Sequence, residues 1–192
     1  MTKPERPRLV VGVSGASGVA YGLRVLDACR ELSVESHLIF SKAAALTLAQ
    51  ETDLSIAQAQ ARADVIHKVG DVGASVASGS FPTLGMIIAP CSVRTMSEIA
   101  TGVTSSLLTR AADVTLKERR PLVLMVRETP LHRGHLRTMV RLAEMGAIIA
   151  PPLQRGFKRE SIGMHESENG LELDFQIQDR EIIAAAPWEK AK

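Results

Sequence analysis

Residues 8–18 read Arg-Leu-Val-Val-Gly-Val-Ser-Gly-Ala-Ser-Gly, a short apolar run that leads directly into a glycine-rich loop. The run at 8–13 predicts a strand that is buried on both faces. The loop at 15–18 predicts a tight turn, and residues 19–32 carry apolar side chains at helical spacing. A strand, a glycine turn and a helix in this order are typical of the first unit of an α/β fold.

The alternation of strand and helix continues along the chain. Further strands are predicted at 35–40, 65–69, 85–90, 122–126 and 147–150. Helices are predicted at 43–50, after Ser92 as a capping residue, and at 133–145, with a glycine- and serine-rich loop at 70–79. This pattern predicts the α/β class: a flavodoxin-like or Rossmann-like doubly wound parallel sheet, three layers in a single domain.

The composition indicates a cytoplasmic globular protein. The 192 residues are 45% hydrophobic and only 3% aromatic, so we expect an aliphatic core between helices and a parallel sheet. A formal net charge of +2 is too small to indicate a surface that binds nucleic acid. The two cysteines form no disulfide framework, and no apolar run approaches the roughly 20 residues that span a bilayer. We therefore expect a reducing, cytoplasmic location and no membrane segment.

The polar residues at the predicted strand ends indicate a mononucleotide site. The glycines of the first loop let the backbone approach a phosphate at a helix N-terminus. An NAD site also carries an acidic residue at the end of its second strand, but here that strand ends at Ile39-Phe40-Ser41. FMN is therefore preferred over NAD. The side chains expected to converge on one cleft at the strand ends are Ser17, Ser41, Ser92 and Arg127.

Other chemistries have less support in the sequence. The five histidines show no repeated metal spacing, so we expect no metal site. Cys91 has no histidine base beside it in the sequence and is interpreted as a small buried residue. Ser17 lacks the G-x-S-x-G context of a hydrolase nucleophile. Hydrolysis is therefore not favoured.

Six separated motifs give a more specific indication than the glycine loop alone. They are 12–18 (GVSGASG), 78–80 (SGS), 89–95 (APCSVRT), 108–113 (LTRAAD), 116–122 (LKERRPL) and 127–130 (RETP). Together they resemble the flavin prenyltransferase (UbiX) family over about residues 8–152. The resemblance predicts an FMN-binding flavoprotein domain at 1–152 and a divergent C-terminal segment at 153–192, packed on the same domain. In that segment Phe157 stands where the family has a tyrosine.

The resemblance implies an enzyme that transfers a dimethylallyl group from dimethylallyl phosphate to reduced FMN. It implies no metal, and it implies a homo-oligomer, a dodecamer. The product, prenylated FMN, would be the cofactor of a UbiD-type decarboxylase, in ubiquinone biosynthesis or in aromatic acid decarboxylation. Dimethylallyl phosphate, other copies of the chain and that decarboxylase are the implied partners.

The resemblance also implies roles for individual residues. The implied catalytic residues are Ser17, Glu51, Lys117 and Glu128. The implied FMN contacts are Gly15, Ala16, Ser17, Ser41, Ser92, Val93, Arg94, Thr95 and Arg127. The implied contacts to the prenyl phosphate are Arg110, Lys117, Glu128 and Phe157. Positive charge on the phosphate side suits a reaction in which phosphate leaves an allylic carbon.

Two other functions remain open at this point. A flavin-dependent cysteine decarboxylase would carry an Asn- and Met-rich substrate segment where this chain reads PCSVRT at 90–95. A non-catalytic FMN-binding partner subunit of a decarboxylase would leave FMN unchanged when dimethylallyl phosphate is supplied. An adduct of the flavin distinguishes the transferase from the partner subunit.

Overall fold

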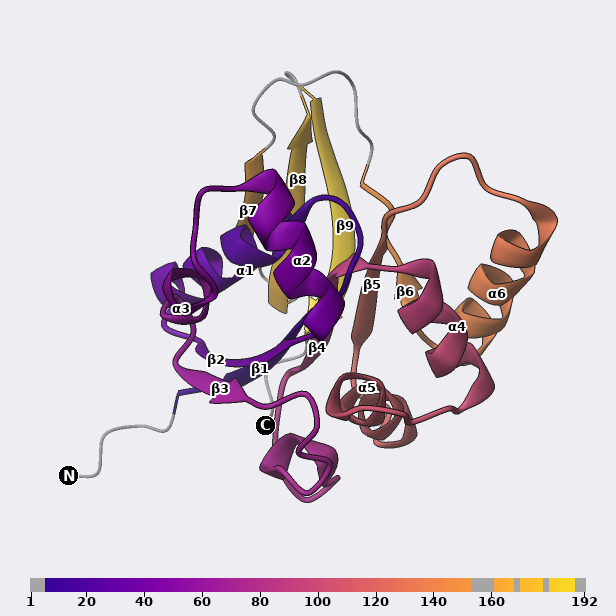
Figure 1. The fold of residues 1–192 in the computed structure, drawn as a ribbon, viewed down its shortest axis with the longest axis horizontal. Coiled ribbons are helices and arrows are strands. Elements are labelled where there is room, and N and C mark those ends of the chain that lie inside the picture. The colour runs from indigo at the N-terminus through magenta and orange to yellow at the C-terminus, as the bar shows by residue number, and fades with distance from the viewer. Residues whose placement is uncertain (1–5, 153–160, 168–169, 178–179, 189–192) are drawn as a thin grey trace.

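A six-stranded parallel sheet forms the centre of the protein (Figure 1). The computed structural model describes residues 6–152 and the backbone of three further strands at 161–167, 170–177 and 180–188. The strands of the central sheet are β1 (Arg8–Val13), β2 (Glu35–Phe40), β3 (Val65–His67), β4 (Gly85–Cys91), β5 (Leu122–Val126) and β6 (Ile148–Ile149). The helices are α1 (Val19–Glu31), α2 (Lys42–Glu51), α3 (Ile56–Gln60), the 3-10 turn η1 (Ser75–Ala77), α4 (Val93–Thr101), α5 (Leu107–Lys117) and α6 (Arg133–Glu144).

The strand order is β3-β2-β1-β4-β5-β6, with every described pair parallel. The chain moves outward from β1 in one direction and then starts again at β4 on the other side. The order therefore reverses between β1 and β4, which is the switch point at which such sheets bind ligands. The predicted doubly wound parallel fold is confirmed.

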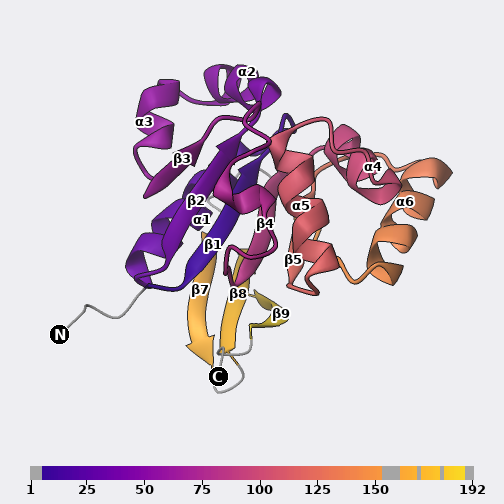
Figure 2. The ribbon, with the colours of Figure 1, turned by 90° about the horizontal axis from the view of Figure 1, so that it is seen from below.

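Side chains of β1 alternate between two apolar cores, one on each face of the sheet. Leu9, Val11 and Val13 belong to the core that α1, α2 and α3 cover. Val10 belongs to the core that η1, α4, α5 and α6 cover. The helices in Figures 1 and 2 accordingly lie in two groups, on opposite sides of the sheet. Burial on both faces explains why these strands read as continuous apolar runs.

A second sheet follows the parallel one in the chain. It consists of β7 (Ser161–Ser167), β8 (Gly170–Ile177) and β9 (Arg180–Trp188), which pair antiparallel in the order β7-β8-β9. Residues 171–177 alternate between apolar and polar amino acids, which is the period of a strand, and they form most of β8. Phe157 lies outside the described residues. The division of the chain at residue 152 and the packing of 153–192 on the same domain stay predictions.

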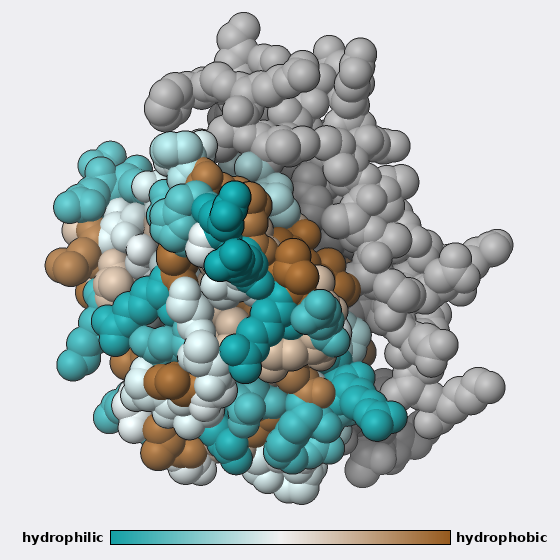
Figure 3. Space-filling view, turned by 90° about the vertical axis from the view of Figure 1, so that its right-hand side faces the viewer, coloured by the Kyte–Doolittle hydropathy of each residue, from teal (hydrophilic) through white to brown (hydrophobic). Residues whose placement is uncertain are grey.

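The face that carries α6 mixes polar and apolar side chains (Figure 3). Leu136 and Val140, one helical turn apart on α6, are 50% and 58% exposed. Leu131, just before the helix, and Met145, just after it, are also exposed. Among the helices in the described part of the chain, none is both long and apolar enough to cross a membrane.

Candidate functional site

A buried serine joins the two loops at the switch point. Ser14 follows β1 and is 1% exposed. Its hydroxyl donates to the Pro90 carbonyl oxygen (2.9 Å), and its Oγ accepts from the Ser92 amide (2.7 Å). The Ser14 amide also donates to the Pro90 carbonyl (3.2 Å). The loop after β1 and the turn after β4 are therefore held as one unit.

Two serines cap the helices that start beside this unit. Ser41 Oγ accepts from the Ala44 amide (3.0 Å) at the start of α2, and Ser92 Oγ accepts from the Thr95 amide (3.2 Å) at the start of α4. Each cap satisfies one of the first-turn N–H groups, which have no partner within the helix. The other first-turn N–H groups of both helices, and the Ser41 hydroxyl, are donors suited to a phosphate.

The glycine loop packs directly on the start of α2. A Cβ on Gly15 would lie 2.3 Å from Ala43 Cβ, far closer than ordinary contact, so the loop can approach α2 only with glycine at this position. This contact brings residues 15–17 beside Ser41. Ser17 is exposed on the loop. The loop that carries Ser17 and the two capping residues Ser41 and Ser92 therefore lie at the same end of the sheet, and their convergence on one cleft stays a prediction.

The N-terminus of α1 is occupied by a carboxylate of the chain itself. Glu51, at the end of α2, accepts from the Gly18 amide (2.9 and 3.0 Å) and from the Val19 amide (2.9 Å). Gly18 is the N-cap residue, has a φ of 97° and supplies no side-chain cap. The negative carboxylate satisfies the helix dipole. Glu51 therefore occupies two of the backbone donors at this helix end, and a phosphate there would compete with its carboxylate; the phosphate site expected at this loop stays a prediction.

The end of β5 lies next to the turn after β4. The Arg127 amide donates to the Cys91 carbonyl oxygen (3.0 Å), which places Arg127 beside Ser92. Glu128 is exposed, and its Oε1 accepts from the Thr129 amide (3.1 Å). Burial raises the pKa of the Cys91 thiol to about 12, which keeps it protonated and unreactive at neutral pH.

The side chains at 92–95 lie in two different environments, the turn after β4 and the solvent-exposed surface of α4. Thr95 is buried, and its Oγ1 accepts from the Ser92 hydroxyl (3.1 Å). Arg94 is 84% exposed and forms an ion pair with Glu98 (2.9 Å) one turn along α4. The Ser92 and Thr95 side chains thus shape the turn, whereas the Arg94 guanidinium lies on the outer surface of the helix.

Lys117 lies near the amino-terminal ends of the strands, which we call the amino edge of the sheet. The residues described above lie near the carboxyl-terminal ends of the strands, the carboxyl edge. Helix α5 begins where the Leu107 amide donates to the Val69 carbonyl (2.8 Å), just beyond the carboxyl end of β3. It ends at Lys117, shortly before the amino end of β5. Arg110, one turn into α5, forms an ion pair with Asp113 (2.9 Å). The structure therefore does not bring Lys117 and Glu128 together within one chain.

Comparisons with known proteins agree with this geometry. The Flavoprotein family matches residues 1–169. Flavin prenyltransferase UbiX of Escherichia coli K12 is 58% identical over 153 residues, which cover 79% of this chain and 81% of that protein. A crystal structure of AnUbiX (PadA1) in complex with FMN and dimethylallyl pyrophosphate is 47% identical, with a TM-score of 0.77 over 79% of this chain and 80% of that one.

The chain belongs to the UbiX flavin prenyltransferase family.

A dodecameric FMN-dependent UbiX-like decarboxylase from E. coli O157:H7 is 44% identical, with a TM-score of 0.75 over 78% of this chain and 82% of that one. The FMN-dependent cysteine decarboxylase TvaF, at 15% identity and a TM-score of 0.62 over 77% of this chain and 91% of that one, shares only the fold. The resemblance to the UbiX family found in the motifs is confirmed.

The residues at the carboxyl edge fit the FMN of a UbiX-type flavoprotein. The edge offers hydroxyl groups, first-turn N–H groups and the guanidinium of Arg127, all donors for a phosphate and for flavin carbonyl oxygens. The position after β2, where an NAD site has its carboxylate, carries the Ser41 cap instead. Among the residues that the structure describes, no three His, Cys, Asp or Glu side chains are grouped as metal ligands would be.

Ser14 is the residue of this UbiX-type site that sequence reasoning missed. It is flanked by Val13 and Gly15 in the glycine-rich loop after β1, and nothing in the sequence spacing distinguishes it from Ser17. The feature that could have identified Ser14 is its position directly after Val13, the last residue of β1. There its side chain turns toward the neighbouring strand end, where two backbone groups need partners.

Proposed function

We propose that this protein is a flavin prenyltransferase that transfers the dimethylallyl group of dimethylallyl phosphate to reduced FMN. The observation that carries the proposal is the donor-rich carboxyl edge without an NAD-type carboxylate, in a chain 58% identical to flavin prenyltransferase UbiX of E. coli. The dimethylallyl pyrophosphate bound to AnUbiX supports an allylic phosphate ester as the second substrate.

The FMN site in this proposal lies across the switch point. Residues 15–17, Ser41 and the turn at 92–95 bind the flavin and its phosphate, and Arg127 adds positive charge from β5. Ser17 lies on the exposed loop, where its hydroxyl can orient the reacting edge of the ring. When bound, reduced FMN supplies the electron-rich N5 and C6 atoms that accept the prenyl group.

The other proposed site residues stabilise the phosphate group as it leaves the substrate. In the transfer, the C–O bond of dimethylallyl phosphate breaks and its electron pair leaves with the phosphate, so that the allylic carbon can bond to the flavin. Cationic groups stabilise the charge on the phosphate, and we assign this role to Arg110, Lys117 and Arg127. Glu128 exchanges a proton with the phosphate oxygen. Phe157 stays a predicted neighbour of the prenyl phosphate.

A complete site in this proposal needs more than one copy of the chain. Lys117 lies at the amino edge of the sheet, so it can reach a prenyl phosphate at the carboxyl edge only on another subunit. The dodecameric E. coli relative and the exposed apolar residues of α6 support a homo-oligomer, and we propose a dodecamer. The molar mass in solution, measured by light scattering, checks this assembly. A monomer would contradict it.

Mixed oligomers test whether two copies share one site. Lys117→Ala and Glu128→Gln chains, which we expect to be inactive when each is expressed alone, are co-expressed with different tags and purified as hybrids. If two subunits build each site, some sites in the hybrid contain both native residues, and activity returns. If each chain builds its own site, every site lacks one residue and the hybrids stay inactive.

The recipient of the product is proposed to be a UbiD-type decarboxylase. The E. coli O157:H7 relative, described as a UbiX-like decarboxylase, supports a link to decarboxylation chemistry. The cytoplasmic location expected from the sequence stays a prediction. The transfer itself is tested by phosphate release: with reduced FMN and dimethylallyl phosphate, the protein should release one phosphate per flavin. Release that is independent of FMN would indicate a phosphatase and overturn the proposal.

A further inference from the structure

The ammonium group of Lys117 is held in a small assembly at the amino edge of the sheet. Lys117 Nζ donates to Glu118 Oε1, and the two side chains are 51% and 33% exposed. The hydrogen bond from the Lys117 ammonium lowers the pKa of the Glu118 carboxyl, so Glu118 is a carboxylate at neutral pH. A long, half-exposed lysine would otherwise sample many rotamers. The hydrogen bond to Glu118 therefore restricts where the Lys117 ammonium points.

Gly79 forms the surface against which this pair rests. A Cβ at position 79 would lie 2.1 Å from Glu118 Oε1 and 2.8 Å from Lys117 Nζ. Both are the far ends of flexible side chains, so any larger residue would displace the pair instead of the backbone. Gly79 also has no positive φ that would exclude alanine. Its lack of a side chain is therefore required by the ion pair and not by the local backbone.

Arg120 fixes Gly79 in place. Its Nη2 donates to the Gly79 carbonyl oxygen (2.6 Å), and its Nη1 donates to the Phe81 carbonyl oxygen (2.7 Å). Arg120 follows Lys117 by three residues, after the end of α5. One guanidinium thus joins the end of α5 to the loop at 78–81 with two charge-assisted hydrogen bonds. A lysine at position 120 would have no planar fork to hold both carbonyls.

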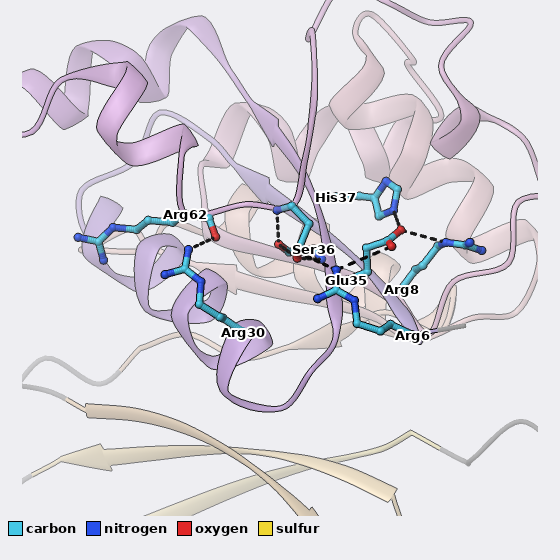
Figure 4. Close-up of polar contacts among 8 residues, drawn as sticks. Arg6, Arg8, Arg30, Glu35, Ser36, His37 and Arg62 are labelled. Carbon is cyan, nitrogen blue, oxygen red and sulfur yellow. Dashed lines mark hydrogen bonds and ion pairs between the residues drawn. The ribbon is translucent and has the colours of Figure 1, made fainter. Parts of the chain in front are cut away.

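The Phe81 ring anchors the other end of the loop in a polar network. The Arg8 guanidinium lies 5.0 Å from the ring centroid, and His37 meets the ring edge-on at 5.1 Å. Arg8 Nε (3.1 Å) and His37 Nε2 (2.9 Å) both contact Glu35 Oε1 (Figure 4). The hydrogen bond with His37, followed by that from Arg8, lowers the pKa of Glu35. The loop therefore rests on a hydrogen-bonded network built around the Glu35 carboxylate.

We propose that Gly79 and Arg120 are positioning residues for the Lys117 ammonium. Arg120 holds the Gly79 carbonyl, Gly79 leaves room for the Lys117–Glu118 pair, and the pair presents the ammonium to the prenyl phosphate of a neighbouring subunit. The inference rests on the proposed function, because it takes the substrate phosphate as the target of Lys117. Neither residue touches the substrate.

Steady-state kinetics with dimethylallyl phosphate, at saturating reduced FMN, test the inference. Gly79→Ala should reduce kcat/KM for dimethylallyl phosphate between about 10-fold and 100-fold, the range expected for a charged group misplaced by up to about 1 Å. FMN occupancy and the thermal midpoint should equal those of the native protein. Gly73→Ala is the matched control: its Cβ would meet only Asp71 Oδ1, at an ordinary 3.6 Å. It should match the native protein in all three readouts.

Two further variants separate positioning from a general structural effect. Adding Glu118→Asp to Gly79→Ala shortens the carboxylate and makes room for the new Cβ, so part of the lost kcat/KM should return. Arg120→Lys should repeat the Gly79→Ala defect, and Arg119→Lys on the neighbouring exposed residue should not. Recovery by a second substitution is not expected if Gly79 only supports folding.

Lys117→Ala separates failure of this inference from failure of the proposed function. If Lys117→Ala lowers kcat/KM but Gly79→Ala and Arg120→Lys behave like their controls, the positioning inference is wrong and the role of Lys117 stands. If Lys117→Ala itself leaves kcat/KM unchanged, the assigned role of Lys117 and the inference built on it both fail.

Discussion

Replacing Ser14 by alanine should weaken the link between the two loops of the proposed FMN site. The substitution removes one oxygen atom and leaves almost no cavity, so its cost comes from hydrogen bonds. The Ser92 amide loses its partner, which costs about 1 to 3 kcal/mol in a buried position. The Pro90 carbonyl oxygen keeps the Ser14 amide (3.2 Å), so its loss is nearer the usual net value of about 0.5 to 1.5 kcal/mol.

Because Ser92 is only half-buried, we expect the lower part of this range, about 2 kcal/mol in the free energy of unfolding. A protein of ordinary stability still folds after such a loss. Urea unfolding of the FMN-free protein measures the change, and a flavin titration should show weaker FMN binding. Ser17→Ala, the same chemical change on an exposed loop residue, should alter stability by less than about 0.5 kcal/mol. Equal stability of the two variants would refute the role of Ser14.

Three further predictions concern pH, the α1 terminus and the C-terminal segment. Burial, and next the charge of His37, lowers the pKa of His67 below 6.5; stability should therefore fall as the pH drops through about 6.5. Urea unfolding at pH 7.5 and 5.5 should show this slope, and His67→Gln should flatten it. Glu51→Ala should cost about 1 kcal/mol of stability, as for a lost helix cap, without tightening FMN binding; tighter binding would mean that a flavin phosphate competes for the Gly18 amide. Replacing 153–192 by the family-type ending should lower the dimethylallyl phosphate concentration for half-maximal rate, and an unchanged value would show that the native segment already completes the phosphate site.

The pattern of apolar residues predicted the strands well, because a strand that is buried on both faces is a continuous run of apolar residues. The strands at 8–13, 35–40 and 122–126 agree residue for residue with β1, β2 and β5. The third strand was expected to reach Val69 but ends at His67, just before a turn in which the Asp71 amide donates to the Lys68 carbonyl oxygen. The short helix α3 was not foreseen, because five residues give too little periodicity.

The sequence predicts the positions of site residues that directly follow a strand. It does not predict on which side of the sheet the end of a helix such as α5 lies. Ser41 and Ser92 follow strands directly, so their convergence followed from topology. The family motifs alone place Lys117 and Glu128 together as contacts to the prenyl phosphate. A helix that leads to the next parallel strand, however, must end near the amino-terminal ends of the strands. The use of the α1 terminus by Glu51 required a contact between residues 33 positions apart, which no local pattern reports.

If the protein attaches a dimethylallyl group to FMN, the mass of the flavin changes, and mass spectrometry detects the change. The protein is incubated anaerobically with reduced FMN and dimethylallyl phosphate, denatured, and the released flavin is analysed by mass spectrometry. We expect a flavin heavier by one dimethylallyl-derived five-carbon unit, formed only when protein, reduced FMN and dimethylallyl phosphate are all present. Unchanged FMN bound to a folded, oligomeric protein would contradict it and indicate a non-catalytic flavin-binding subunit.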